Sequence, residues 1–420
     1  MADRHEDSDT YPRWLSITGE SLDLDLPNGL LGKCRSIDDY KKLNHLGEGT
    51  YGVVYRAHDL TTTSPHTVVA LKQMRLLDRD RSNGMPITSI REIALLRSIR
   101  HPNIISVLDV AVGKDMADVY MVMEYAEQDM AHLLDDLRVK FTLSEVKNLT
   151  KQLLEGVEYI HRNNIIHRDI KMSNLLYNSK GQLKLADFGM ARHFSHRPLT
   201  PDVVTVWYRP PEILLGCVRY TKSADMWSCG LILGELLLLV PLLPGETELE
   251  QLSLIVKFLN PPTDEIWPKM RLLPKFSGQV LFRKPAEERD SGSDSKNGSI
   301  SLEKRFWGHT VETVNLLKDI LQWDPERRLT AKKALDHRWF RSEDPKAKDT
   351  LMMPTFPELR RGQGGGGVAA SMAEKVTRRG AEQAGKAGVG PYLFDFGEGP
   401  VERKGRHGDH GGRAAKKLRH

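Results

Sequence analysis

The hydrophobic period of this chain is mostly strand-like in its first part and mostly helical in its second, and that change limits the folds available to it. In residues 43–72 the apolar positions form short strand-like runs separated by turn-forming residues, which is typical of antiparallel strands. A helical period follows Pro86, with Thr88 and Ser89 as candidate caps, and residues 119–125 indicate one more strand. From a capping box at Thr142 onward, apolar residues recur every three or four positions. We therefore predict an α+β fold of two lobes: a small antiparallel sheet with one helix, then a larger, mainly helical part.

The ends of the chain differ in composition from its middle. Residues 360–420 hold 13 basic and 6 acidic residues, a net of 13 − 6 = +7, whereas the whole chain carries +5. A basic, Gly-rich segment with few apolar residues cannot offset the entropy of ordering itself. The expected segments are a polar, disordered leader (1–38), the sheet-rich lobe (39–126), the helical lobe (127–340) with a mobile insertion at 285–301, a C-terminal extension (341–361) and a basic, disordered tail (362–420).

Several classes of protein are disfavoured by the cysteines and the apolar stretches. Cys34, Cys217 and Cys229 offer neither a disulfide framework nor a zinc site, which favours a reducing compartment. The first ten residues are acidic and polar, unlike a secretory signal or an Arg-rich transit peptide. The most apolar stretch, residues 230–243, is interrupted by charge and proline and is shorter than the roughly 20 residues that cross a bilayer. We therefore expect no membrane span.

A Gly-rich segment joins the first two expected strands. Gly47-Glu-Gly49-Thr-Tyr-Gly52 can aim backbone N–H groups at a phosphate chain, although a turn that merely uses glycine has the same signature. Lys72 ends the third strand and Glu92 lies on the following helix, so the two can form an ion pair that presents an ammonium to anionic oxygens. Taken singly, a snorkelling lysine and a solvated glutamate are the commoner outcomes.

Two short loops carry the other reactive groups. His167-Arg-Asp169-Ile-Lys171-Met-Ser-Asn174 places a carboxylate, an ammonium and an amide within eight residues, and Asp187-Phe-Gly189 follows a further strand. Phosphoryl transfer needs a carboxylate that orients and deprotonates a hydroxyl group, a cation near the moving group and hard oxygen ligands for Mg²⁺. Either loop alone is uninformative. Together with the glycine loop, Lys72 and Glu92 they occur in the order of a known signature.

In this order the motifs resemble those of eukaryotic protein kinases, and the resemblance covers about residues 43–340. It implies the bilobal protein kinase fold, with ATP between the lobes. Lys171, two residues after Asp169, resembles the lysine found at that position in the serine/threonine class of these kinases. The implied catalytic residues are Asp169 as base, Lys171, Thr205 as the bridge between them, and Lys72 braced by Glu92; the implied Mg²⁺ ligands are Asn174 and Asp187.

The resemblance also implies which residues contact ATP. The glycine loop would cover the phosphates and Lys72 would meet the α and β phosphates. The hinge backbone would meet adenine, with a gatekeeper behind it and a leucine as the floor. The implied set is Leu46, Gly47, Glu48, Gly49, Thr50, Tyr51, Gly52, Val53, Val54, Ala70, Lys72, Met123 (gatekeeper), Glu124 and Ala126 (hinge) and Leu176 (floor).

The helix after Pro86 narrows the resemblance to one subfamily of protein kinases. P-I-T-S-I-R-E at residues 86–92 resembles the corresponding helix of cyclin-dependent kinases and differs only at Ile90 from the P-I-T-S-L-R-E version of the branch of cyclin-dependent kinases ten and eleven. In such kinases this helix docks a cyclin, which brings Glu92 to Lys72. The resemblance thus implies a cyclin partner at residues 86–92, protein substrates and a nuclear location, with a cytoplasmic pool left open.

Phosphorylation and substrate choice are likewise implied by the resemblance. Thr200 matches the activating site, and Arg91, Arg168 and Arg192 match the arginines that gather around its phosphate. Thr50 and Tyr51 match inhibitory phosphorylation sites beside the ATP phosphates. Val204 and Arg209 match the pair that favours proline after the acceptor, because proline has no N–H to satisfy.

One departure from the pattern is Pro210-Pro-Glu212, where the family has A-P-E. Glu212 is kept, and Arg328 is available as its buried partner, so we expect the helical lobe to hold. Asp225 matches the aspartate that braces the catalytic loop.

Two other functions stay open. A pseudokinase or scaffold would bind ATP or partners without turnover. That interpretation predicts a broken catalytic motif, but Lys72, Glu92, Asp169, Asn174 and Asp187 are all present. The basic tail could make weak, salt-sensitive contacts with RNA, although a solvated tail or one that directs nuclear import fits its composition better.

Overall fold

A computed structural model of the chain describes residues 14–15, 21–22, 34–49, 52–62, 67–74, 85–113, 118–194, 205–276, 301–341 and 344–356. All of these lie within one compact unit, residues 1–371. The predicted tail and nearly all of the predicted insertion lie outside the described residues, as do Thr50, Tyr51 and Thr200. Within the described ranges, no helix is both long enough and apolar enough to span a bilayer.

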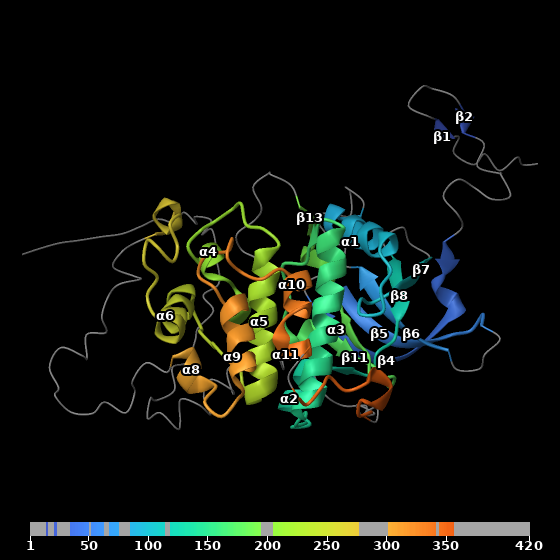
Figure 1. The fold of residues 1–420 in the computed structure, drawn as a ribbon. Helices are drawn as coiled ribbons and strands as arrows, with labels where there is room; N and C mark the ends of the chain where they lie inside the picture. Colours follow the sequence, from blue (N-terminus) through green and yellow to red (C-terminus); the bar gives the residue numbers. More distant parts are fainter. Residues whose placement is uncertain are drawn as a thin grey trace, which may run out of the picture. The chain divides into compact units, whose positions relative to one another are not determined.

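Six strands form the sheet of the first lobe, in the order β3-β7-β8-β6-β5-β4 (Figure 1). All neighbours are antiparallel except β3 and β7, which are parallel. A separate short antiparallel pair is formed by β1 (Trp14–Leu15) and β2 (Ser21–Leu22). The strands of the sheet are β3 (Arg35–Ser36), β4 (Tyr40–Gly49), β5 (Gly52–Asp59), β6 (Val68–Met74), β7 (Val107–Val112) and β8 (Val119–Glu124).

The edge strand β3 belongs to the segment that we expected to be a disordered leader. Arg35 fixes it, because its guanidinium donates to the Asp59 carboxylate at 2.7 and 2.9 Å and lies 4.4 Å from the centre of the Tyr40 ring. The folded part therefore begins before the predicted boundary at residue 38. The sequence pattern also failed to predict β7.

The register of the sheet places four of the predicted nucleotide contacts on one face. Ala70 lies opposite Met123, and Val54 lies opposite Lys72. Because side chains alternate along a strand and directly paired residues share a face, these four side chains point to the same side of the sheet.

Helix α1 (Ile87–Ser98) packs against the sheet and contacts the short turn at Phe188–Met190 (Figure 1). Pro86 is its N-cap and makes no side-chain capping bond, so the prediction that Thr88 or Ser89 caps the helix was wrong. Glu92, Leu95 and Leu96 are buried, whereas Ile87 and Ile90 are exposed.

The second lobe is mainly helical, as predicted. Helices α3 and α5 lie side by side at its centre (Figure 1), and α3 begins with the predicted capping box of Thr142 and Glu145. Its helices are α2 (Met130–Asp135), α3 (Leu143–Arg162), α4 (Pro211–Leu214), α5 (Ser223–Leu238), α6 (Glu248–Leu259), α8 (Leu302–Arg305), α9 (Val311–Ile320), α10 (Ala331–Leu335) and α11 (Arg338–Arg341).

Short strands carry the loops of interest at the junction with the sheet. They are β9 (Gln128–Asp129), β10 (Ile165–Ile166), β11 (Leu175–Tyr177), β12 (Leu183–Leu185) and β13 (Arg192–His193). The loop from His167 to Asn174 lies between β10 and β11, and Asp187 follows β12. The predicted α+β, two-lobed architecture is confirmed.

Candidate active site

Lys72 stands at the centre of the predicted site and binds two carboxylates. Its Nζ lies 2.6 Å from Glu92 Oε1 on α1 and 3.2 Å from Asp187 Oδ1 after β12. Lys72 and Glu92 are both buried. Three elements that are distant in the sequence therefore meet at one ammonium group, and the predicted Lys72–Glu92 pair is observed.

The charges of this cluster support one another. Burial alone would lower the pKa of the Lys72 ammonium, but Asp187 and Glu92 outweigh burial and hold that pKa above its ordinary value. Burial also opposes the charge of Asp187, and Lys72 reverses that effect, so the pKa of Asp187 lies below its ordinary value. For Glu92 burial prevails and raises the pKa. The Lys72–Glu92 pair is nevertheless ionised, because a buried ammonium requires its counter-ion.

Asp169 is held by its own loop. Its Oδ2 accepts hydrogen bonds from Lys171 Nζ at 2.8 Å and from Asn174 Nδ2 at 3.0 Å. The same amide nitrogen donates to the Asp169 carbonyl at 2.7 Å. Within the described residues, neither Asp169 Oδ1 nor the amide oxygen of Asn174 takes part in a hydrogen bond, so both are available to a ligand. Thr205 is described and exposed, but no hydrogen bond within the described ranges joins it to Asp169 or Lys171.

The catalytic loop is braced from α5, where Asp225 is fully buried. Its carboxylate accepts from the backbone N–H groups of His167 and Arg168, each at 2.9 Å, and from His161 Nε2 at 2.8 Å. The predicted bracing role of Asp225 is thus observed. The sequence did not single out His161, which lies on the buried face of α3 and has no motif around it.

Two residues of the site have left-handed backbone conformations. Arg168 has φ +71° and Asp187 has φ +61°. Such angles are uncommon outside glycine and cost free energy, so they persist only where surrounding contacts impose them. At Asp187 the carboxylate bond to Lys72 is one such contact, and at Arg168 the bond from its N–H to Asp225 is another.

The glycine loop is described on both sides of its tip. A Cβ at Gly52 would lie 2.0 Å from the Gln73 carbonyl oxygen, so packing against β6 requires glycine there. A Cβ at Gly47 would meet no heavy atom within 4 Å. Protein packing therefore explains Gly52 and leaves Gly47 unexplained.

The residues present fit a divalent cation shared with a phosphate chain. Asp187 supplies a carboxylate and Asn174 an amide oxygen, which are the hard donors that Mg²⁺ prefers. Among the described residues, no cluster of three or more His, Cys, Asp or Glu side chains could hold a metal by itself. Mg²⁺ usually completes its shell with phosphate oxygens and water.

The predicted phosphate-binding arginines are only partly tested, because Thr200 lies outside the described residues. Arg168 is buried, donates through Nε to the Met190 carbonyl at 2.7 Å and through Nη1 to the Tyr220 hydroxyl at 2.9 Å. Its other terminal nitrogen, Nη2, has no hydrogen-bond partner within the described residues. Arg91 and Arg192 are half-buried.

The segment after Thr205 is anchored to the helical lobe. Glu212 receives two hydrogen bonds of 2.6 Å from Arg328, and both side chains are buried, so the predicted partner is observed. Arg209 bonds Glu248 on α6. The Tyr208 hydroxyl donates to Glu235 on α5 at 2.6 Å, a buried contact that no sequence pattern predicted.

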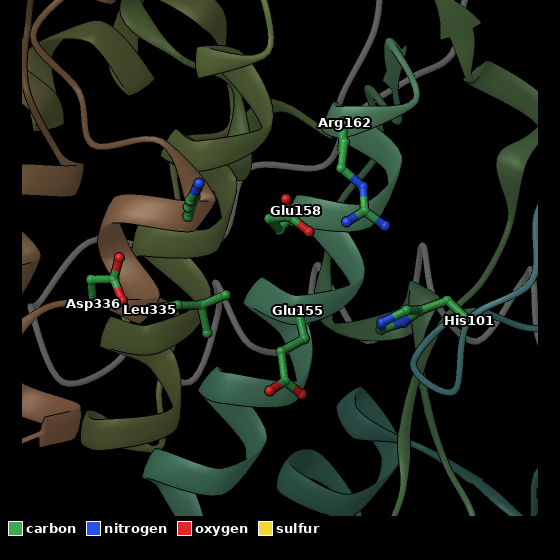
Figure 2. Close-up of a pocket in the computed structure, with 7 residues that line it drawn as sticks. His101, Glu155, Glu158, Arg162, Leu335 and Asp336 are labelled. Carbon is green, nitrogen blue, oxygen red and sulfur yellow. The ribbon is translucent and has the colours of Figure 1, made fainter.

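A separate hollow of about 510 Å³ lies away from these residues. Figure 2 shows side chains from α3 and His101 across it from those of α10 and Asp336. None of the predicted site residues lines it. The lining residues are His101, Glu155, Glu158, Arg162, Lys332, Leu335 and Asp336.

Comparison with known proteins agrees with this geometry. A family model described as "Protein kinase domain" matches residues 40–340. Cyclin-dependent kinase 10 of Mus musculus is 44% identical over 336 residues, which cover 80% of this chain and 88% of that protein. Cyclin-dependent kinase G-2 of Oryza sativa is 44% identical over 79% of this chain and 45% of its own length. A chain of the CAK complex from Chaetomium thermophilum, solved bound to ATP-γ-S, is 39% identical with a TM-score of 0.65, over 76% of this chain and 96% of that one.

Proposed function

The chain belongs to the protein kinase family and within it to the cyclin-dependent kinases, and from that premise we propose that it transfers the γ-phosphoryl group of Mg-ATP to a serine or threonine followed by proline, once a cyclin is bound. The observation that carries the proposal is the convergence of Lys72, Glu92 and Asp187 at 2.6 and 3.2 Å. Asp169 supports it, because the hydrogen bonds from Lys171 and Asn174 fix its carboxylate.

In this reaction the protein's own groups bind, orient and deprotonate. The oxygen of the substrate hydroxyl forms a bond to the γ-phosphorus while the bond from that phosphorus to the bridging oxygen of ADP breaks. Asp169 Oδ1 accepts the hydroxyl proton, and Lys171 stabilises charge on the transferred group. Lys72 holds the α and β phosphates. Asn174 and Asp187 would hold Mg²⁺, which neutralises charge on the phosphates when it is bound.

The segment around Thr205 is proposed to determine substrate choice and activation. The buried Arg168 guanidinium has one terminal nitrogen without a described partner, which suits a phosphate on Thr200. Arg209 is bound to Glu248, which supports its proposed role beside the residue after the acceptor. Val204, the other member of that pair, lies outside the described residues.

The direct test is Asp169→Asn in the full-length chain with a cyclin supplied. We expect phosphate transfer from [γ-³²P]ATP to a Ser-Pro peptide to fall by about 10²–10⁴-fold, because the base is lost while its shape is kept. ADP affinity should stay within about two-fold of the natural protein. Unchanged turnover would refute the proposed mechanism. A natural chain that binds ADP but never transfers phosphate would support the pseudokinase alternative.

The cyclin is proposed to cover the exposed face of α1. Ile87 and Ile90 there are 69% and 51% exposed. Since truncating a central apolar anchor commonly costs about 2 kcal/mol or more of association free energy, Ile90→Asp should weaken cyclin binding by roughly 30-fold. The matched control is Leu272→Asp, at an exposed leucine outside α1, which should leave binding unchanged. Equal effects of the two substitutions would exclude α1 as the docking surface.

A further inference from the structure

The ammonium of Lys184 joins three segments of the chain. Its Nζ donates to the Glu124 carboxylate at 2.9 Å and to the Pro102 carbonyl oxygen at 2.9 Å. Glu124 ends strand β8, Pro102 follows α1, and Lys184 itself lies on β12 of the other lobe. The partners are 60 and 82 residues away in the sequence. One side chain thus ties the end of β8 and the segment after α1 to β12.

The same carboxylate makes a further contact within the sheet lobe. Glu124 Oε1 accepts a hydrogen bond from Ser106 N at 2.7 Å, and Glu124 N donates to Ser106 O at 3.0 Å. The Lys184 side chain is only 6% exposed and that of Glu124 is 26% exposed. A buried ammonium held by several hydrogen bonds is costly to separate from its counter-ion, so this contact fixes the relative positions of the segments that it joins.

These segments border the proposed nucleotide site. Glu124 begins the backbone stretch that would meet adenine, and Lys184 lies directly opposite Leu176, the proposed floor of the adenine pocket. Asp187 follows Lys184 by three residues. Backbone bonds reinforce the arrangement, because Ile105 N donates to Leu185 O at 3.0 Å and Leu185 N donates to Asn103 O at 2.9 Å.

We propose that Lys184 is a positioning residue of the nucleotide site, which holds the hinge backbone at residues 124–126 against the helical lobe before adenine binds. The inference rests on the proposed function, since it assumes that adenine meets this backbone. In this proposal the Glu124 carboxylate positions the hinge, whereas the resemblance implied only that the Glu124 backbone contacts adenine. Holding a binding surface in place before the ligand arrives strengthens binding, because less ordering remains to be done on association.

The test is a double-mutant cycle on nucleotide affinity. The dissociation constant of ADP in the presence of MgCl₂ is measured by calorimetry on the full-length chain and on Lys184→Met, Glu124→Gln and the double variant. We expect Lys184→Met to weaken ADP binding on the order of 10-fold and Glu124→Gln to weaken it less, because the amide oxygen still accepts a hydrogen bond. The double variant should be no weaker than Lys184→Met, because both changes break the same contact.

A matched control separates positioning from general loss of stability. Lys348 binds Glu145 at 2.8 Å, also linking segments far apart in the sequence, at the start of α3. Lys348→Met should lower the melting temperature and leave the affinity for ADP unchanged. With cyclin bound, Lys184→Met should raise the KM for ATP by the same factor as its effect on ADP, with kcat and the peptide KM within two-fold.

The outcomes are distinguishable. ADP affinities of Lys184→Met and Glu124→Gln within two-fold of the natural protein, with melting temperatures lowered as in the control, would overturn the inference and leave the proposed function intact. A natural chain that does not bind ADP would overturn both. If Lys184→Met does not fold, Glu124→Gln decides the question, because it keeps the shape and the hinge backbone.

Discussion

Glu92 and Glu212 are buried carboxylates that each bind a cation at 2.6 Å, yet their surroundings differ. Arg328 grips Glu212 with two nitrogens, donates also to the Gln322 and Ser223 carbonyls, and lies 4.9 Å from the centre of the Trp227 ring. Lys72 reaches Glu92 with one nitrogen and shares it with Asp187. In the first pair the cation has several further partners in its own lobe, whereas in the second it joins the sheet to α1 and to Asp187.

The helix that carries Glu92 is also held less firmly than the scaffold of the other lobe. Helix α1 has no side-chain cap and exposes two isoleucines, whereas α3 has a full capping box and is buried along most of its length. A helix with an uncapped start and an uncovered apolar face can shift at low cost, and a partner that covers that face can bias its position. The Glu212 pair therefore maintains the fold, while the Glu92 pair belongs to an adjustable site.

The largest expected effect on stability comes from Glu212→Gln. We expect a loss of about 3–5 kcal/mol in the free energy of unfolding, because the Arg328 guanidinium would remain buried without its counter-ion. Urea denaturation followed by tryptophan fluorescence measures it. The control is Glu303→Gln, which removes an exposed ion pair with Lys318 at 2.8 Å and should cost about 1 kcal/mol or less. Similar losses in the two variants would show that burial and bidentate geometry do not matter here.

Glu235 is a third buried carboxylate, and it accepts a hydrogen bond from the Tyr208 hydroxyl. Burial raises the pKa of Glu235 to about 7. As the pH rises from the ordinary carboxyl pKa of 4.5 to about 7, the unfolded chain loses this proton before the folded chain does. The contribution of Glu235 to stability is thus fully present below pH 4.5 and falls by about 3 kcal/mol across that window.

The measurement is the difference in unfolding free energy between the natural protein and Glu235→Gln from pH 4.5 to 8. Other titrating groups, such as buried histidines with lowered pKa values, cancel in that difference. We expect the natural protein to lose stability relative to the variant as the pH rises through this window. A pH-independent difference would mean that Glu235 does not titrate in it.

Local sequence patterns predicted much of the fold and, in the candidate site, the pair of Lys72 and Glu92. Strands β4, β5 and β6 correspond to the predicted strand-like runs between turn-forming residues, and the capping box at Thr142 marks the start of α3. The motifs around Asp169 and Asp187 indicated where the candidate site lies, because the residues of interest stand in short segments whose order along the chain is informative. Contacts between remote segments that no motif marks were not predicted: Lys184 contacts Glu124 across 60 residues, and no local period indicates that contact.

Strand β3, which the sequence did not predict, also depends on contacts between remote segments. Strand β3 has two residues and exists because Arg35 finds Asp59 across 24 residues and the backbone pairs with β7. Its own sequence shows no strand period. The predicted cap of α1 was also wrong. Pro86 is the N-cap, and its fixed backbone angle starts the helix without a side-chain hydrogen bond.

The smallest expected effect on stability, and the other half of the comparison, comes from Glu92→Gln. The amide oxygen can still accept a hydrogen bond from Lys72, and Asp187 at 3.2 Å remains a counter-ion, so the unfolding free energy should change by about 1 kcal/mol. Phosphate transfer by the cyclin-bound chain should nevertheless fall by about 100-fold, because without the charge of Glu92 the ammonium is drawn to Asp187 and away from the phosphates. Steady-state kinetics and urea denaturation on one preparation measure both. A stability loss as large as that of Glu212→Gln would place both pairs among the contacts that maintain the fold, and unchanged transfer would remove Glu92 from the site.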